Sequence, residues 1–477
     1  MALAILESKS RQHADLCQRH RATSKPRTIV DDLLITFADL DFVRRSVLGG
    51  RTELCLVLMC GRTSRADGRA RVLVREVVVP AEDDYTRRSQ LEAELRPAFV
   101  ARWAKIAART KSSLVFVHSH PGSAAPEFSR IDDAGEEVLA HFFRHRTPDL
   151  QHLALVVSDG GYACRYLGSD RHLRLIAVGD DRRVLFDPSR SHNPSDLYDR
   201  QVRAFGRAGQ SILQSLRVGI VGLGGTGSLA VQQLAHLGVK EFVLVDPDVV
   251  ELTNLNRLAG SASADTGQAK VAVAERYIRA VQPRAVVTSF QENVVFVETA
   301  KKLRDVDVLF CCTDSHGSRA VLQQLAYQYL IPCIDIGTVI AVKGGKITHI
   351  TGRAQMLSPG LACLTCGGLL DGNEVRRDMM SEAERKQDPY LVGAREPAPA
   401  VISINSTITS LAITMFLSAV VGVPSPARHL LYDGLRSRLR SVKGEPVEDC
   451  IVCSRAGVLA RGDGLALQGR LAQNVNR

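Results

Sequence analysis

The sequence lacks any uninterrupted apolar run that nears the roughly 18 residues needed to span a membrane. Its first residues, MALAILESKSRQ, do not follow the charged-then-apolar plan of a signal peptide. These two absences argue against the membrane-spanning and secreted classes of protein. We therefore expect a cytoplasmic protein with no membrane partner.

A disulfide framework is also missing. The chain has 11 cysteines in 477 residues, and four of them stand in two CxxC pairs, which indicates thiols and metal binding. The net charge of +10 could indicate nucleic-acid binding, but the Lys and Arg residues are scattered among acidic residues. We expect no nucleic acid as a partner and favour an acidic protein.

Length and composition set the domain plan. At about 150 residues per domain the chain holds three domains, or two with one of them large. An apolar content of 45% is ordinary for a globular protein. We predict a lead-in over 1–27, a mixed α/β domain over 28–178, a polar linker over 179–197, a second α/β domain over 198–456 and a loosely ordered tail over 457–477.

The second domain is organised around a glycine-rich turn. VGIVG reads as a strand, SLAVQQLAHLG reads as a helix, and between them lie Gly222, Gly224, Gly225 and Gly227. Glycines let the backbone approach a phosphate, and the helix N-terminus points its N–H groups at it. A second strand ends at Asp246, which can hold a ribose hydroxyl. Taken alone, the pattern fits a dinucleotide dehydrogenase equally well.

Polar residues beyond this turn favour phosphate chemistry over hydride transfer. Asn254 and Arg257 lie three residues apart, and Lys270 follows in GQAK. Splitting a triphosphate between its α and β phosphorus atoms requires cations on the developing charge. A further strand, VDVLFCCTD, places Asp314 at its C-terminal end, where ligands of open α/β sheets gather. Asp314 could instead cap a helix that begins near Gly317.

The stretch from Tyr198 to Cys453 resembles the ubiquitin-activating enzyme superfamily, in the ThiF- and MoeB-like branch of bacterial adenylyltransferases for molybdopterin and thiamine synthesis. The resemblance implies a Rossmann-like, doubly wound adenylation domain that uses ATP and Mg²⁺, with Asp314 holding the magnesium. It also implies a homodimer in which Arg200 reaches an ATP phosphate of the other subunit.

Two CxxC pairs predict a structural zinc site. Cys363, Cys366, Cys450 and Cys453 would form a closed tetrahedral four-thiolate site with no open position for chemistry. The gap between the pairs is longer than in a compact zinc ribbon, but the family places one pair on either side of its crossover loop and last helix. The apolar segment after Pro399 is predicted to be that helix and to lie in the core.

A thioester-forming cysteine is absent from its expected place. Members of the superfamily that carry ubiquitin as a thioester have a reactive Cys between the first CxxC pair and the last helix. In this chain no Cys occurs from Gly367 to Asp449. Cys311, Cys312 and Cys333 lie among apolar neighbours, and we expect them to be buried. The acyl-adenylate would then pass to a thiol on another protein or to a sulfur donor.

The first domain contains a candidate catalytic metal site. His118 and His120 alternate off the end of a strand, and Asp132 begins the following helix. Two imidazoles and a carboxylate leave one tetrahedral position for water, which is typical of catalytic zinc. Glu53 is the candidate base. Upstream of these histidines, apolar periodicity predicts a long helix over QLEAELRPAFVARWAKIAAR, or one that starts at its proline.

This pattern resembles the JAMM metalloprotease family, which has an MPN domain. The signature of a Glu, then HxHP, then SxxD matches Glu53, His118 to Pro121, and Ser129 to Asp132, with eight residues between His120 and Ser129, one more than is common. The resemblance implies that a zinc-activated water attacks a peptide or isopeptide carbonyl. Glu53 would shuttle the proton and Ser129 would donate to the oxyanion.

Together the two halves predict a bifunctional enzyme. It would trim or deconjugate a ubiquitin-like protein and adenylate its C-terminal glycine carboxylate, with a conjugating enzyme as a further partner. An alternative is activation of a sulfur-carrier protein for thiocarboxylate formation in cofactor or cysteine synthesis, which the missing Cys favours. A third hypothesis is a non-catalytic partner-binding module, which ATP–pyrophosphate exchange would distinguish.

Overall fold

The structure is a computed structural model that describes residues 30–50, 52–65, 67–89, 93–120, 122–189, 196–387 and 399–471. The chain divides into the units Met1–Val30 and Asp31–Arg477, and the described helices and strands lie in the second. The predicted lead-in, the motif residue Pro121, part of the predicted linker and the last six residues lie outside the described residues.

The N-terminal half of this unit is built on one eight-stranded mixed sheet. Its elements are β1 (Asp32–Thr36), α2 (Phe37–Leu48), β2 (Cys55–Ser64), β3 (Ala70–Val78), β4 (Tyr85–Arg88), β5 (Ala93–Leu95), α3 (Pro97–Thr110), β6 (Ser113–His120), α4 (Arg130–Arg146), β7 (Leu153–Ser158), β8 (Gly161–Tyr166), β9 (Arg174–Val178) and β10 (Arg182–Phe186). The strand order is β10-β9-β1-β3-β2-β6-β7-β8, and β4 pairs with β5 separately. Because the edge strands β8 and β10 contact each other, the sheet is nearly closed into a barrel.

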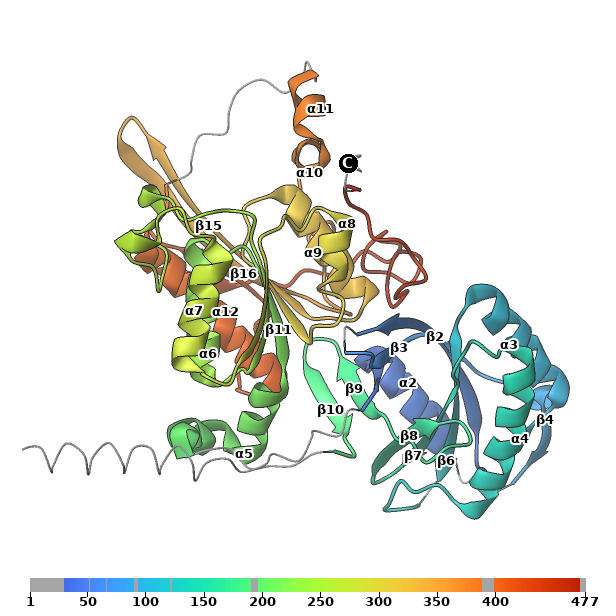
Figure 1. Ribbon diagram of the computed structural model, residues 1–477. Coiled ribbons are helices and arrows are strands. Elements are labelled where there is room, and N and C mark those ends of the chain that lie inside the picture. The colour runs from blue at the N-terminus through green and yellow to red at the C-terminus, as the bar shows by residue number, and fades with distance from the viewer. Residues whose placement is uncertain are drawn as a thin grey trace, which may run out of the picture. The chain divides into compact units, whose positions relative to one another are not determined.

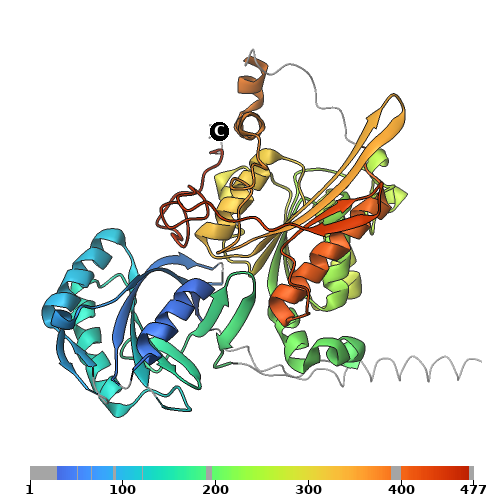
Figure 2. The same cartoon turned by 180° about the vertical axis from the view of Figure 1, so that it is seen from behind.

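Helices cover both faces of this sheet. Helix α2 packs on one face through Leu40, Val43 and Val47, whereas α3 and α4 pack on the other through residues such as Phe99 and Phe143 (Figures 1 and 2). The alternative start of α3 is confirmed, because the helix begins with its proline at the first position and the preceding residues form β5. Proline suits the first helical turn because its missing N–H would have no partner there.

The C-terminal half is a second eight-stranded sheet with helices on both faces. Its elements are α5 (Asp199–Ser215), β11 (Arg217–Val221), α6 (Gly225–Leu237), β12 (Glu241–Val245), α7 (Lys270–Val281), β13 (Val286–Phe290), α8 (Val297–Lys301), β14 (Val308–Cys311), α9 (His316–Gln328), β15 (Cys333–Lys343), β16 (Lys346–Leu357), α10 (Gly372–Met379), α11 (Glu382–Gln387), α12 (Ile402–Val421), β17 (His429–Asp433) and β18 (Arg438–Ser441).

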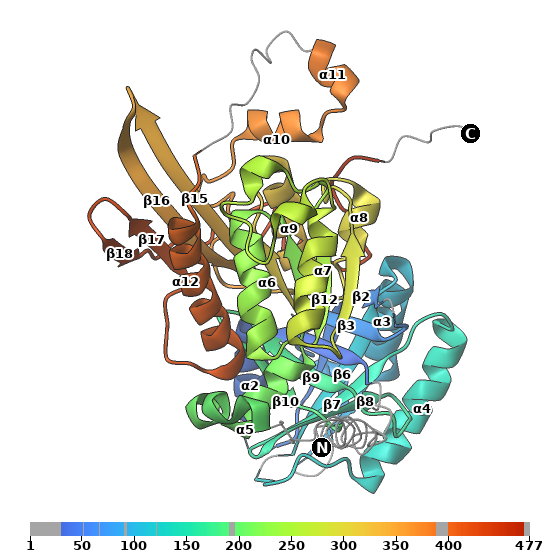
Figure 3. The same ribbon diagram turned by 60° about the vertical axis from the view of Figure 1, so that its left-hand side comes forward.

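The strand order confirms a Rossmann-like, doubly wound domain. Strands β13, β12, β11, β14 and β15 run parallel in that spatial order, and β16, β17 and β18 continue the sheet antiparallel (Figure 3). Helices α6, α7 and α12 cover one face, and α8 and α9 cover the other (Figure 1). The direction in which successive strands are added to the sheet reverses between β11 and β14. Ligands are therefore expected at the carboxyl ends of β11, β12 and β14, here called the carboxyl edge.

Helix α12 confirms the predicted core helix. Among the described helices it is the one that is long and apolar enough to span a membrane by length and composition, but 56% of its most apolar window is buried in the protein. It packs against α6, β15 and β16, with Ile408, Ala412 and Phe416 almost fully buried. Its apolar character is therefore accounted for by the core of this half.

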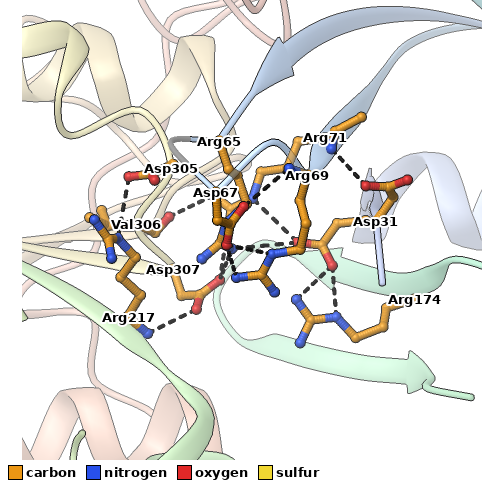
Figure 4. Close-up of polar contacts among 12 residues, drawn as sticks. Asp31, Arg65, Asp67, Arg69, Arg71, Arg174, Arg217, Asp305, Val306 and Asp307 are labelled. Carbon is orange, nitrogen blue, oxygen red and sulfur yellow. Dashed lines mark hydrogen bonds and ion pairs between the residues drawn. The ribbon is translucent and has the colours of Figure 1, made fainter. Parts of the chain in front are cut away.

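A buried charge cluster joins the two sheets (Figure 4). Asp32 in β1 accepts hydrogen bonds from Arg71 Nε at 3.3 Å and Arg174 Nε at 2.7 Å. Arg71 also donates from Nη2 to Asp307, in the loop before β14, at 2.5 Å. Asp307 receives a further bond from Arg182 at 2.9 Å. The two halves thus share ion pairs that have almost no contact with solvent, because Arg71 is 1% exposed and Asp307 is 5% exposed.

The C-terminal segment is ordered, so the prediction of a loosely ordered tail is wrong for its described part. Ala460 and Leu467 are buried in a core cluster, and Ala460 N donates to the carbonyl of Tyr327 in α9 at 3.0 Å. Farther on, Asp463 N donates to the carbonyl of Arg62 in β2 at 2.8 Å. This segment lies beyond the last predicted motif, and sequence periodicity gave no sign of its contacts.

Candidate functional sites

The glycine-rich turn between β11 and α6 has two glycines that packing requires. Gly222 has a φ of +85°, and a Cβ there would lie 2.7 Å from the carbonyl oxygen of Cys312. A Cβ on Gly227 would clash with the carbonyl of Gly222. A Cβ on Gly224, by contrast, would meet nothing within 4 Å. The open side of the turn is therefore at the N-terminus of α6, where backbone N–H groups can bind a phosphate.

Asp246 follows β12 and fixes this turn. Its carboxylate accepts the N–H of Leu223 at 2.6 Å and the N–H of Asp248 at 2.8 Å. Burial raises the pKa of Asp246 above its usual value, although Lys270 and these two N–H groups oppose the shift. A carboxylate has about four lone-pair sites, so the two oxygens keep acceptor capacity for the predicted ribose hydroxyl.

Two predicted cations flank the turn. Lys270 opens α7, and its Nζ lies 2.7 Å from Asp248 Oδ2. Its side chain and Leu223 of the turn line the same small cavity. Arg257 donates from Nη1 to the carbonyl of Thr253 at 2.6 Å, and its Cδ would lie 3.6 Å from a Cβ on Gly225. The structure thus brings both cations to the carboxyl edge.

Asn254 lies in the short helical turn that precedes Arg257. Its Oδ1 accepts the N–H of Glu251 at 3.3 Å. The side-chain amide group can still donate, because this bond uses only the oxygen. Asn254 therefore has a local structural role beside the predicted contact with the nucleotide.

Asp314 lies at the carboxyl edge, two residues beyond Cys312, whose carbonyl packs against Gly222. It is exposed. The alternative role as a helix cap is wrong, because Ser315 caps α9 by accepting the N–H of Ser318 at 3.1 Å. The Asp314 carboxylate thus stays available for the predicted Mg²⁺, for which carboxylate oxygens are preferred ligands.

One polar residue at the turn was missed by sequence reasoning. Asn405, in the first turn of α12, is 3% exposed, and its Nδ2 would clash with a Cβ on Gly225. Its Oδ1 accepts the hydroxyl of Thr338 at 3.0 Å. Asn405 lies 180 residues beyond Gly225, so local pattern could not connect them. The available signal was a polar start to an otherwise apolar helix.

Arg200 lies at the opposite end of α6 from the turn. It is exposed in the first turn of α5, and its neighbour Gln201 donates to the carbonyl of His236 near the C-terminus of α6 at 3.1 Å. A helix rises about 1.5 Å per residue, so α6 separates the two regions by roughly 20 Å. Arg200 is therefore remote from the turn of its own chain.

The four predicted zinc ligands converge. The sulfur of Cys363 lies 3.5 Å from that of Cys366 and 3.6 Å from that of Cys450, and the sulfurs of Cys366 and Cys453 are 3.4 Å apart. Tetrahedral zinc with Zn–S bonds of about 2.3 Å separates its sulfurs by about 3.8 Å. The backbone N–H of Val447 points at Cys366 Sγ at 3.3 Å, as expected for support of a metal thiolate. The four residues thus fit a closed structural zinc site.

Replacing Cys366 with serine should lower the melting temperature and the zinc content together. Thiolate zinc contributes directly to folding free energy, and three sulfurs hold the ion less well than four. Differential scanning fluorimetry beside metal analysis checks this, with Cys164→Ser as the control for zinc content, because Cys164 is a buried cysteine outside the cluster. A Cys366→Ser protein that keeps its zinc and its melting temperature would contradict a single zinc site shared by the two CxxC pairs.

A second candidate metal site lies at the end of β6. His118 and His120 point to one face, with Nε2 atoms 3.1 and 3.3 Å from the two carboxylate oxygens of Asp132 in α4. All three ligand atoms lie within 4.8 Å of one another. Burial raises the pKa of Asp132, but interactions with the two imidazoles outweigh it and bring the pKa well below its usual value. The contact of the buried His118 Nε2 with Asp132 Oδ1 lacks hydrogen-bond geometry despite its 3.1 Å length, and a divalent cation would satisfy this nitrogen.

The two other predicted members of this set lie close by. Glu53 lines the same cavity as His118 and Asp132, just before β2. Ser129 is the N-cap of α4, where its hydroxyl accepts the N–H of Asp132 at 3.2 Å and Asp132 accepts the N–H of Ser129 at 2.6 Å. Ser129 thus holds the Asp132 carboxylate in place, a role that the sequence did not predict.

Comparisons with known proteins concern the C-terminal half. A model of the ThiF family matches residues 198–452, more than half of the chain. The molybdopterin-synthase adenylyltransferase of Escherichia coli is 30% identical over 260 residues, which cover 54% of this chain and 96% of that protein. The SAMP-activating enzyme E1 of Haloferax volcanii is 27% identical over 267 residues, covering 55% and 90%. A crystal structure of E. coli MccB with ATP is 16% identical with a TM-score of 0.43, covering 56% and 76%.

Proposed function

Because the chain belongs to the ThiF family, we propose that its C-terminal half adenylates the C-terminal carboxylate of a ubiquitin-like or sulfur-carrier protein. The observation that carries this proposal is the gathering of the glycine turn, Lys270, Arg257 and Asp314 at one carboxyl edge. The relatives named above are an adenylyltransferase for molybdopterin synthase and a SAMP-activating enzyme, which supports the same class of substrate.

In the proposed reaction, a carboxylate oxygen of the small protein attacks the α-phosphorus of ATP. The bond from the α-phosphorus to its bridging oxygen breaks, so an acyl-adenylate forms and pyrophosphate leaves. Lys270 and Arg257 would stabilise the negative charge that develops on the phosphates. Asp314 would hold Mg²⁺, which neutralises charge on the leaving group. The N-terminus of α6 would bind phosphate oxygens through its backbone N–H groups.

Transfer of the acyl group away from the chain is part of the proposal. Cys311 and Cys333 are buried, and burial raises the pKa of the Cys312 thiol to about 12. A thiol in that state supplies almost no thiolate at neutral pH. These cysteines therefore do not serve as thioester sites, which supports the sulfur-carrier alternative. The acceptor would be a sulfur donor or a thiol on another protein.

A homodimer completes the proposed site. Arg200 lies near the far end of α6 from the turn of its own chain, as described above. It can contact an ATP phosphate only if a second copy presents it. Mixing an Arg200→Ala chain with a Lys270→Ala chain tests this, because mixed dimers would regain one intact site.

The experiment for the adenylation itself is ATP–pyrophosphate exchange. The full-length protein is mixed with ATP, labelled pyrophosphate and a sulfur-carrier protein from the same cell that ends in Gly-Gly. We expect exchange that requires the carrier and disappears when its last glycine is removed. A folded protein that supports no exchange with any such carrier would instead favour the non-catalytic, partner-binding alternative.

We also propose that the N-terminal half is a zinc peptidase of the JAMM type, acting on the same class of small protein. The observation that favours it is the convergence of His118, His120 and Asp132 within 4.8 Å, with Glu53 lining the same cavity. Two imidazoles and a carboxylate are a donor set that suits zinc, and the metal would supply Lewis acidity. Glu53 would accept the proton from the attacking water, and the Ser129 hydroxyl would donate to the developing oxyanion.

Substitutions separate the parts of this proposed peptidase. Glu53→Gln should keep zinc and lose hydrolysis, because an amide cannot accept the proton. His118→Ala should lose the metal, because two protein ligands remain. Ser129→Ala should keep some metal, slow turnover by roughly 10²- to 10³-fold and lower stability by about 1 kcal/mol, since Ser129 caps α4.

Metal analysis beside cleavage of a ubiquitin-like fusion protein distinguishes these outcomes. His141→Ala is the matched control, because His141 lies on the same helix, α4, outside the three-residue metal set. It should keep both zinc and activity. An active Glu53→Gln protein would show that another acid serves as the base or that this half is not a peptidase.

A further inference from the structure

A cavity of about 500 Å³ opens beside the His118, His120 and Asp132 set. One end of it is polar and carries Glu53, His118 and Asp132. The rest of its wall is mainly apolar and includes Leu95 from β5, Val100 from α3, Phe116 from β6 and Leu139 and Phe142 from α4. Concave, largely apolar sites with a few convergent polar groups are the usual form of a ligand site.

Helix α4 turns an apolar stripe toward this cavity. Ile131, Gly135, Val138 and Phe142 recur at helical spacing and all line it. Ile131 is 62% exposed and Val138 is 70% exposed. Large apolar side chains left open at the rim of a cavity indicate a surface that a ligand covers.

Gly135 keeps the middle of this stripe open. It lies inside α4, where glycine is less favourable than alanine by roughly 0.5–1 kcal/mol. A Cβ on Gly135 would meet nothing within 4 Å, so packing within the protein does not require glycine here. The missing side chain instead leaves space in the cavity wall.

The charges in the wall argue against an anionic occupant. Four carboxylates, those of Glu53, Glu94, Asp132 and Glu136, line the cavity, and Glu136 is already paired with Arg165, whose Nη2 lies 3.0 Å from Glu136 Oε1. A carboxylate of a ligand placed against Leu95 and Phe116 would lose its hydration and meet charges of its own sign. An apolar side chain has no such hydration to lose, and binding in the same place removes its apolar surface from water.

We propose that this cavity is a specificity pocket for a large apolar side chain of a peptide substrate, at a position next to the bond that is cleaved. The inference rests on the proposed peptidase function of the N-terminal half. The polar end would receive the scissile carbonyl, and the apolar wall would receive the neighbouring side chain. The pocket therefore selects for leucine or phenylalanine over aspartate beside the cleaved bond.

The test uses the full-length, zinc-loaded protein and a set of fluorogenic peptides. The peptides carry Phe, Leu, Gly, Lys or Asp at each of the two positions that flank the cleaved bond. We expect Phe or Leu at one of these positions to raise kcat/KM roughly 10- to 100-fold over Asp, which is the range that apolar pockets provide.

Gly135→Leu supplies the decisive variant. Its side chain would occupy part of the cavity, so the preference for Phe over Gly should disappear while the zinc content persists. Gly135→Ala is the matched control, because its single methyl group leaves most of the volume and removes a helix glycine. It should retain the preference and be no less stable than the parent protein.

Binding measurements separate failure of the pocket from failure of the peptidase. Calorimetry with Glu53→Gln protein and the Phe peptide should show binding that Gly135→Leu weakens at least tenfold. An active protein with no side-chain preference would overturn the pocket and leave the peptidase. A zinc-loaded protein that cleaves no peptide would overturn the peptidase, and unchanged binding in the Glu53→Gln, Gly135→Leu double variant would overturn the pocket as well.

Discussion

Replacing Lys270 or Asp314 with alanine should reduce carrier-dependent ATP–pyrophosphate exchange by at least roughly 10²- to 10³-fold, the usual loss for one group that stabilises developing charge. Lys270 lies beside the glycine turn, and Asp314 lies at the end of β14 without serving as the cap of α9. Any cleavage of a ubiquitin-like fusion protein by the proposed peptidase should be unchanged, because His118, His120 and Asp132 belong to the other half of the protein.

The matched control for this experiment is Lys301→Ala. Lys301 also lies in the C-terminal half, but it forms an exposed ion pair with Glu298 at 2.7 Å, one helical turn away. Such pairs contribute little to stability, so this variant should keep both exchange activity and melting temperature. Parental exchange by either Lys270→Ala or Asp314→Ala would remove these residues from the proposed site.

Replacing Asp307 with alanine should destabilise the protein by about 3–5 kcal/mol, the cost of removing one partner from a buried ion pair. Asp307 is the carboxylate that Arg71 and Arg182 contact at 2.5 and 2.9 Å, and Arg65 Nη1 lies 3.7 Å away. Without it, Arg71 would keep only its ion pair with Asp32. A denaturation midpoint should fall clearly, whereas Asp199→Ala, which removes an exposed pair with Arg203, should change it little.

The same cluster should make stability depend on pH in acid. Burial raises the pKa of Asp307, but Arg182, Arg71 and Arg65 outweigh it and bring the pKa well below its usual value of about 4. A depressed folded-state pKa contributes stability that is present above the unfolded-state pKa and is lost as pH falls. The gap in stability between the parent protein and Asp307→Asn should therefore shrink below about pH 4. A gap that stays constant down to pH 2 would mean that Asp307 is not the titrating group.

Local sequence signals predicted the fold of the C-terminal half because its strands and turns are marked by short segments. The glycine turn and Asp246 follow a strand directly, Asp314 comes three residues after β14, and parallel strands bring their carboxyl ends to one edge. What local signals could not predict are contacts across long separations. Asn405 reaches Gly225 from the last long helix, and Arg71 reaches Asp307 across 236 residues.

The N-terminal half shows a second limit of pattern reasoning. Apolar spacing continues from Leu91 through Leu95 into α3, so periodicity alone extends the helix too far, whereas Leu95 lies in β5. Proline at the first helical position is the stronger signal, because its ring excludes a preceding helical turn. The two histidines and Asp132 were predictable because strand alternation and a helix start place them without any distant contact.

The ordered C-terminal segment decides where this protein can be divided for engineering. A recombinant C-terminal half could be ended at residue 456, the boundary expected from the last CxxC pair. The carbonyl of Tyr327 would then lose its hydrogen bond from Ala460 N, and the side-chain amide of Gln328 would lose its acceptor, the carbonyl of Gly462. A half that kept the segment but lacked β2 would leave Asp463 N without the carbonyl of Arg62. Neither half is therefore expected to fold well when it is expressed alone. Substitutions at the candidate sites are better made in the full-length chain.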